Sequence, residues 1–190
     1  MTATILLVRH AAHSQLEHVL CGRAGDVPLS EAGSAQALRL ARRLGDGGQL
    51  TVVDVAPIQI ANTRRKLEPW PQARAQVADL TEPMGVSFDA VCCFFLLHEV
   101  PTYARHRIVT NLLEAVEPGG KIVFVDYHKP RWWHPMGPAM ALVFRSLEPF
   151  ANSLLAEEIA SMVPQTAGFE WTKETFFGGL YQKVVGIRRR

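Results

Sequence analysis

Residues 50–67, "LTVVDVAPIQIANTRRKL", decide the fold, because they join an apolar strand to a helix through one short turn. The run at 50–55 is continuous and rich in β-branched residues, which is typical of a buried strand. Pro57 follows where a helix can begin, since its fixed φ and missing N–H suit the first helical position. The stretch predicts one strand-to-helix unit of a parallel sheet.

The same alternation continues on both sides of this unit. Upstream, an apolar run at 4–9 predicts a strand, and "LSEAGSAQALRLARRL" at 29–44 predicts a helix that Ser30 caps. Downstream, buried strands are predicted at 88–97 and 121–127, with a helix at 104–116 between them. Strands that alternate with helices favour a parallel sheet with helices on its faces.

The last third of the chain departs from this pattern. The proline-broken stretch at 131–155 is rich in Trp, Phe, Met and Leu, and it predicts an apolar helical cap. Two extended runs around Gly178-Gly179 predict an antiparallel hairpin. We therefore expect an α/β fold: a three-layer, Rossmann-like, mostly parallel sheet with a C-terminal hairpin. The chain is expected to form a single domain over 1–190, with a strand-and-helix opening segment at 1–48 and a larger body at 49–190.

Composition limits the classes of function. The chain has 190 residues, 48% of them hydrophobic, so a packed core is expected and intrinsic disorder is not. A net charge of +2 with scattered basic residues gives no indication of nucleic-acid binding. The three cysteines form neither a disulfide framework nor a metal-ligand spacing, which suits a reducing compartment. No signal peptide or membrane span is recognised, so we expect a cytoplasmic protein that is soluble or peripheral at the inner membrane face.

Residues 49–190 resemble the class I S-adenosylmethionine-dependent methyltransferases. The resemblance rests on the order of "GGQLTVVDVAPIQIANTRRKL", "AQVADLTEP", "FDAVCCFFLLHEVP" and "LLEAVEPGGKIVFVDYH". It implies S-adenosylmethionine as cofactor, with Asp54 accepting hydrogen bonds from the ribose hydroxyls. It also places Asp79 and Leu80 at the adenine. The Gly-rich loop of this family is missing, and residues 1–44 stand in its place.

Four shorter stretches resemble the rhodoquinone-biosynthesis branch of that superfamily: "VVDVAPIQI", "FFLLHEVP", "VDYHKPRWWHP" and "ETFFGGLYQKVV". That branch is associated with replacing a methoxy group of ubiquinone by an amino group. The resemblance implies a lipid quinone substrate, with Tyr127, Trp132 and Trp133 in contact with it. The aromatic and basic residues around 131–155 suit an interfacial helix at a membrane surface, and equally a cap that packs on the sheet.

Catalytic candidates lie at the ends of two predicted strands. His98 follows one strand, while Asp126 and His128 end the next, where substrate meets cofactor in open α/β folds. Histidine titrates near neutral pH and suits acid–base catalysis. If the second strand continues, Asp126 and His128 share a face and could hold a divalent metal. The alternative is that all three are ordinary hydrogen-bonded residues at strand ends.

The opening stretches "LLVRHAAHS" and "GRAGDVPLSEAGSAQALRLARRL" resemble the N-terminus of the histidine phosphatase family. The resemblance implies that His10 is a phosphoryl-accepting nucleophile, with Arg9 and Arg23 binding phosphate. The family's later catalytic residues are not found, so we expect a fusion of two sequence types. Three functions remain open: a quinone-modifying enzyme, a non-catalytic remnant of its fold, and a phosphohydrolase that uses His10.

Overall fold

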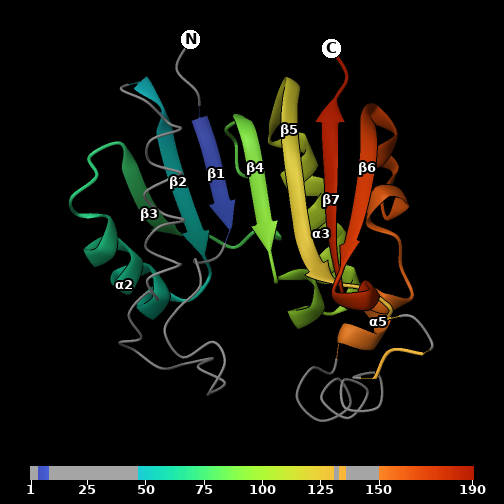
Figure 1. Ribbon diagram of the computed structural model, residues 1–190. Helices are drawn as coiled ribbons and strands as arrows, with labels where there is room; N and C mark the ends of the chain where they lie inside the picture. The colour runs from blue at the N-terminus through green and yellow to red at the C-terminus, as the bar shows by residue number, and fades with distance from the viewer. Residues whose placement is uncertain (1–3, 9–46, 131–132, 136–149) are drawn as a thin grey trace. The chain divides into compact units, whose positions relative to one another are not determined.

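The computed structural model describes residues 4–8, 47–130, 133–135 and 150–190 (Figure 1). Its contacts group into two compact units, Met1–Asp79 and Leu80–Arg190. Each unit has its own sheet strands and at least one helix packed on them.

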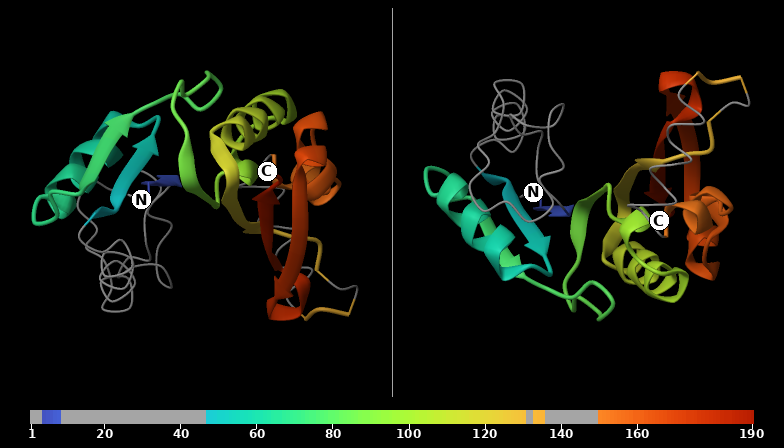
Figure 2. Two further views of the ribbon diagram at one scale, coloured as in Figure 1. Left: turned by 90° about the horizontal axis from the view of Figure 1, so that it is seen from above. Right: turned by 90° about the horizontal axis from the view of Figure 1, so that it is seen from below.

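The described residues of the first unit form three parallel strands in the order β3-β2-β1. Their bounds are Thr4–Val8 for β1, Gln49–Asp54 for β2 and Ala73–Val77 for β3. Helix α2, Pro57–Leu67, lies along one face of β2 and β3 (Figure 2). Leu50, Val52, Ile60 and Ala75 form a buried apolar cluster in this unit.

Local sequence explains why α2 forms where it does. Ala56 is extended at the N-cap, Pro57 occupies the first turn, and Ile60 N–H donates to the Ala56 carbonyl. Three basic residues, Arg64 to Lys66, lie in the last turn, where positive charge complements the helix dipole. The predicted strand-to-helix unit at 50–67 is thus confirmed.

In the second unit, the part of the chain that the structure describes forms four strands in the order β4-β5-β7-β6. Strands β4 and β5 are parallel, whereas β7 is antiparallel to both β5 and β6. The strand bounds are Phe88–Phe94 for β4, Val116–Tyr127 for β5, Phe169–Phe176 for β6 and Tyr181–Arg188 for β7. The helices are α3 at Thr102–Glu114 and α5 at Ala151–Leu155, with single turns η2 at Leu97–Glu99, η3 at Ile159–Ser161, η4 at Pro164–Gly168 and η5 at Phe177–Gly179.

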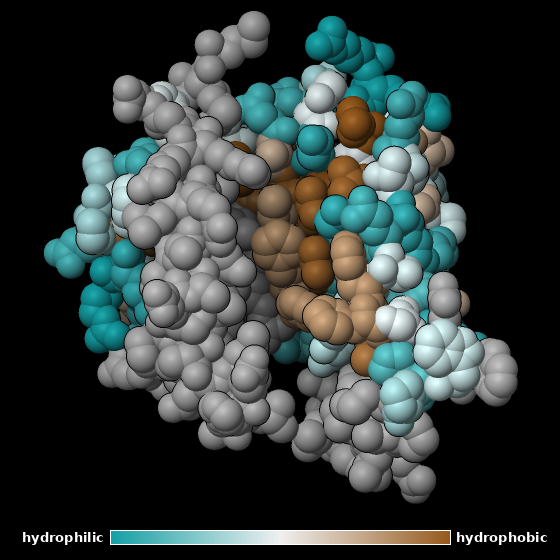
Figure 3. Space-filling model, in the orientation of Figure 1, coloured by the Kyte–Doolittle hydropathy of each residue, from teal (hydrophilic) through white to brown (hydrophobic). Residues whose placement is uncertain are grey.

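Burial alternates along the strands of the second unit. Val91, Ile122, Phe124 and Val184 are fully buried, and the strand register places them on one face of the sheet. Helix α3 packs against β5 (Figure 2). Neighbouring residues on the opposite face are only half-buried, and Figure 3 shows hydrophobic side chains gathered over this part of the sheet. The period of two is what a sheet with one well-covered face requires.

The expected fold class is confirmed: a mostly parallel α/β sheet with an antiparallel C-terminal hairpin. Two boundaries differ from the prediction. Strand β4 ends at Phe94 rather than at residue 97, because Phe95 has a φ of 51°, outside the extended region. The helix predicted at 104–116 is α3, which begins at Thr102 and ends at Glu114. It ends earlier than predicted because β5 already starts at Val116.

Two predicted elements lie largely outside the described residues. These are the helix at 29–44 and most of the cap at 131–155. Within the latter range, α5 forms a short helix at its C-terminal end. Strand β3 was not predicted, since "ARAQV" carries too few apolar residues to stand out; it pairs with β2 alone and most of its side chains are exposed.

Candidate functional site

The cofactor candidate Asp54 lies at the last residue of β2, directly before α2. Its carboxylate Oδ1 accepts a hydrogen bond of 2.8 Å from the Ala56 N–H. This bond orients the carboxylate and leaves the second oxygen to accept from hydroxyl groups. Asp54 thus ends a strand with an oriented carboxylate, an arrangement that suits hydrogen bonds accepted from hydroxyl groups.

Asp79 follows β3, the strand that pairs with β2. The Ala78 N–H donates to the Asp54 carbonyl at 3.1 Å, which brings the residue before Asp79 beside Asp54. Asp79 itself is exposed, and Leu80 after it is buried, with its carbonyl accepting from Asn111 Nδ2 at 2.8 Å. An exposed carboxylate next to an anchored apolar residue suits contact with an adenine ring and its amino group.

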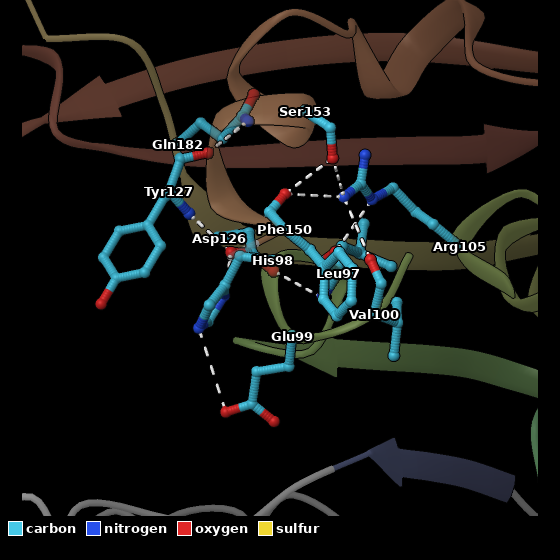
Figure 4. A network of polar contacts seen from close by, with 10 residues as sticks. All are labelled: Leu97, His98, Glu99, Val100, Arg105, Asp126, Tyr127, Phe150, Ser153 and Gln182. Carbon is cyan, nitrogen blue, oxygen red and sulfur yellow. Dashed lines mark hydrogen bonds and ion pairs between the residues drawn. The ribbon is translucent and has the colours of Figure 1, made fainter. Parts of the chain in front are cut away.

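His98 and Asp126 form a buried pair in the second unit. His98 Nδ1 lies 2.6 Å from Asp126 Oδ1, although the two residues are 28 positions apart. They are 3% and 1% exposed, respectively. Strand β5 presents Asp126, and the η2 turn after β4 presents His98 (Figure 4).

The Asp126 carboxylate is surrounded by hydrogen-bond donors. It accepts from the Leu97 N–H at 2.9 Å and from the Tyr127 N–H at 2.7 Å, in addition to His98. A carboxylate can only accept, so the proton of a neutral His98 ring lies on Nδ1. His98 Nε2 is then a proton acceptor, and it lies 4.0 Å from Glu99 Oε1.

An aromatic cluster, defined as Phe95, Tyr127, Phe177 and Tyr181, lies beside this pair. The Tyr127 ring is 4.4 Å from the His98 ring and stacks on Tyr181 at 5.6 Å. Phe95 and Phe177 each meet Tyr181 edge-on at 5.8 Å. The four rings come from the ends of β4, β5 and β6 and the start of β7, which the strand pairing brings together.

Two members of the aromatic cluster have an unusual backbone. Phe95 and Phe177 have φ values of 51° and 50°, and no other non-glycine residue in the described ranges has a positive φ. Such a conformation is strained for a bulky residue and tends to occur at functional sites. Phe177 is also 76% exposed, so a large aromatic face is held toward solvent.

Arg105 of α3 holds the η2 turn in place. Its guanidinium is fully buried and donates to the Leu97 carbonyl at 2.8 Å and to the Val100 carbonyl at 3.2 Å, on either side of His98. It also binds the Phe150 carbonyl, and it pairs with Glu157 at 3.2 Å. One arginine therefore links the turn that presents His98 to the segment around α5 (Figure 4).

The structure brings together only part of the predicted site. His98, Asp126 and Tyr127 lie together, whereas His128 points elsewhere: its Nδ1 is 2.9 Å from the Gly179 carbonyl. Strand β5 ends at Tyr127, so the alternation expected for Asp126 and His128 is not continued. Among the described residues no cluster of three or more metal-ligating side chains occurs, and the metal site remains a prediction.

Other predicted positions are exposed or undescribed. Trp133 is 54% exposed. Arg9, His10, Arg23 and Trp132 lie outside the described residues, so the phosphate-binding and phosphoryl-transfer roles remain predictions. Within the described part of the chain, no helix is both long and apolar enough to span a membrane.

Sequence reasoning missed several residues of this site. Phe95, Phe177 and Tyr181 were not singled out, although "FF" before Gly178-Gly179 and Tyr181 after it mark the tip of the predicted hairpin. Arg105 was missed as well, because an arginine in a helix is ordinarily solvated. The repeated aromatic residues at a hairpin tip were the one usable signal.

Comparisons with known proteins agree with this fold. A family model described as a methyltransferase domain matches residues 32–120. Among curated proteins, none matches the sequence. The chain is similar to the N-methyltransferase NodS from Bradyrhizobium japonicum WM9, at 13% identity over 99% of this chain and 86% of that chain, with a TM-score of 0.60.

Two further solved structures give the same result. NodS in complex with S-adenosyl-l-homocysteine matches at 13% identity over 99% of this chain and 79% of that chain, with a TM-score of 0.59. An O-methyltransferase family protein from Burkholderia thailandensis matches at 16% identity over 98% of this chain and 51% of that chain, with a TM-score of 0.62. The chain thus has the fold of the class I S-adenosylmethionine-dependent methyltransferases.

Proposed function

We propose that this chain is an S-adenosylmethionine-dependent enzyme that acts on a quinone, of the type used in rhodoquinone biosynthesis. The observation that carries the proposal is the buried His98–Asp126 pair under the aromatic cluster. A histidine held by a carboxylate is suited to accept a proton from a substrate, and flat aromatic faces are suited to stack on a planar ring. A quinone supplies the planar ring, and its reduced quinol form supplies a hydroxyl group that can give up a proton.

The cofactor part of the proposal rests on Asp54 and Asp79 of the first unit and on Leu80, the next residue along the chain. These residues would bind the ribose and adenine groups, and the oriented carboxylate of Asp54 fits that role. S-adenosylmethionine supplies an electrophilic methyl group when bound. The similar NodS structure holds S-adenosyl-l-homocysteine, the product that a methyl donor leaves behind.

In the second unit each residue has a distinct task. Tyr127 and Tyr181 stack on the quinone ring, and exposed Phe177 shields its outer face from water. His98 Nε2 accepts the proton that the reacting group of the substrate gives up. The resulting imidazolium is stabilised by Asp126 at Nδ1 and by Glu99 near Nε2.

A lipid quinone also implies contact with a membrane surface. The exposed Trp133 belongs to the aromatic-rich stretch 131–155, whose composition suits such contact. We therefore propose that the surface around Trp133 associates peripherally with a bilayer. Binding of the purified chain to vesicles, with and without Trp133→Ala, tests this part.

The first experiment is a calorimetric titration with S-adenosylmethionine. We expect saturable binding by the unmodified chain and a loss of affinity of about tenfold or more in Asp54→Asn, because a charge-assisted hydrogen bond to the ribose is removed. Glu68→Gln is the matched control, since Glu68 is an exposed carboxylate of the same unit after the end of α2. Absence of binding in the unmodified chain would favour a non-catalytic remnant.

The second experiment concerns the substrate. The chain is incubated with S-adenosylmethionine and a short-chain ubiquinone, once in its oxidised and once in its reduced form. Mass spectrometry then identifies the products. Any modified quinone whose formation is lost in His98→Ala supports the proposal. Binding of the cofactor with no change in the quinone would contradict the substrate assignment while leaving the cofactor assignment intact.

A further inference from the structure

A pocket of about 350 Å³ lies in the second unit, apart from the aromatic cluster. It is bounded by the residues that follow β5, by the end of α5 and the residues after it, and by Gln182 of β7. Neither His98, Asp126 nor any ring of the aromatic cluster lines it. The pocket is therefore a second place where a small molecule could bind.

Gln182, one of the residues that line this pocket, has an unsatisfied acceptor. Its side chain is 2% exposed, and Nε2 donates to the Tyr127 carbonyl at 2.8 Å. A carbonyl oxygen can only accept, so this bond fixes the orientation of the amide and turns Oε1 away from Tyr127. In the described part of the chain, Gln182 Oε1 is the single buried side-chain polar atom with no hydrogen-bond partner.

An orphaned buried acceptor is rare and destabilising, and it points to a partner that the protein itself does not supply. The missing partner must bring an N–H or O–H donor. Both signs of charge line the pocket beside it. Glu157 and Glu158 contribute carboxylates, which also pair with Arg105 and Lys173 through Oε2, while exposed Lys129 has no ion-pair partner among the described residues.

We propose that this pocket binds a small zwitterion, a molecule that carries an ammonium group and an anionic group a few bonds apart. The ammonium donates to Gln182 Oε1 and faces the carboxylate of Glu157, and the anionic group pairs with Lys129. A free amino acid and the phosphoethanolamine headgroup of a lipid share this chemistry. The inference does not depend on the quinone chemistry proposed above.

The test is a calorimetric titration of the full chain with L-glutamine and with O-phosphoethanolamine. We expect saturable binding of at least one probe, weakened about tenfold or more in Gln182→Leu and in Lys129→Ala. Lys121→Ala is the matched control, because Lys121 is an exposed lysine of β5 that does not line the pocket. Circular dichroism checks the fold of each variant, and Lys129→Ala keeps the test valid if Gln182→Leu does not fold.

A second arm distinguishes the two sources of the zwitterion. Binding to phosphatidylethanolamine vesicles that is reduced in Lys129→Ala identifies a headgroup, whereas binding of the free probes alone identifies a metabolite. The proposal is overturned if neither probe binds, or if both variants bind as the unmodified chain does. In that case water alone occupies the pocket and satisfies Gln182.

Discussion

At the scale of single residues, the decisive feature is the contact between His98 and Asp126. Asp126 accepts hydrogen bonds from a ring nitrogen and from two backbone N–H groups, so its carboxylate is fully engaged. The bond to Nδ1 sets which nitrogen of His98 carries the proton, and hence which nitrogen can take one from a substrate. Asp126 is thus a positioning residue, and His98 is the catalytic candidate.

Replacing Asp126 by Asn tests this assignment. An amide of the same shape offers a weaker acceptor or a donor to Nδ1, so the ring loses its fixed tautomer and its stabilised positive charge. We expect turnover of the quinone to fall about a hundredfold or more, with a changed pH profile and unchanged cofactor affinity. Asp89→Asn, at an exposed carboxylate near the start of β4, is the control. Equal turnover in both variants would show that Asp126 has only a structural role.

Cys92 gives a second prediction at this scale. Burial raises the pKa of its thiol from 9.0 to about 11, because a thiolate is poorly solvated inside the sheet. At pH 8 we expect alkylation by iodoacetamide to be roughly a hundredfold slower in the folded chain than in urea, since the thiolate fraction falls by that factor. Peptide mass spectrometry measures both rates. Fast labelling of folded Cys92 would contradict the burial seen here.

The same shift predicts how stability depends on pH. The folded pKa is raised, so the contribution of Cys92 is present below pH 9 and is lost between pH 9 and about 11, where the unfolded chain releases its proton first. Urea unfolding across this window, compared with Cys92→Ala, measures the effect. The variant should lack this part of the alkaline decline.

At the scale of elements, the C-terminal hairpin shows how a glycine allows two strands and a ring to pack closely. Gly186 of β7 is paired with Trp171 of β6, and an added Cβ would lie 2.7 Å from the Trp171 ring and 3.0 Å from Ile122. Gly186→Ala should therefore reduce the free energy of unfolding by about 1–3 kcal/mol.

The matched control for this prediction is Gly168→Ala. A Cβ at Gly168 would meet nothing within 4 Å, so a change of less than about 0.5 kcal/mol is expected. Both values come from urea unfolding curves. A similar loss in the two variants would mean that Trp171 moves aside freely and that the ring does not restrict this strand.

Elements with a strong local pattern were predictable from sequence, and weakly patterned ones were not. Helix α2 was found because Pro57 marks its start, and β4 because "FDAVCCF" is apolar apart from Asp89. Strand β3 was missed because Arg74 and Gln76 alternate with small apolar residues along an edge. Its stability comes from the hydrogen bonds to β2, which no local pattern encodes.

At the scale of the whole molecule, cofactor binding should be visible as thermal stabilisation. A ligand that binds only the folded chain raises the free energy of unfolding by about 2.7 kcal/mol at a concentration of one hundred times its Kd. We expect S-adenosylmethionine to raise the Tm by about 5–10 °C in the unmodified chain and by much less in Asp54→Asn. Differential scanning calorimetry measures both. An equal rise in Tm in the two proteins would show that Asp54 does not contribute to cofactor binding.

The sequence by itself determined the fold class and the strand ends at which functional residues lie. Alternating strand and helix patterns, a proline at a helix start and a glycine pair at a hairpin tip are local signals, so they can be read from neighbouring residues. They located Asp54, His98 and Asp126 at strand ends before any contact was known.

Only the tertiary structure decided which of these residues meet. Asp126 contacts His98, whereas His128 contacts the Gly179 carbonyl. Buried Arg105 holds the η2 turn that presents His98, and Gln182 Oε1 is left without a hydrogen-bond partner. Each of these facts depends on strand register and on helix packing between residues far apart in the chain. Such contacts are set by the burial of the whole core, and short-range sequence patterns do not contain that information.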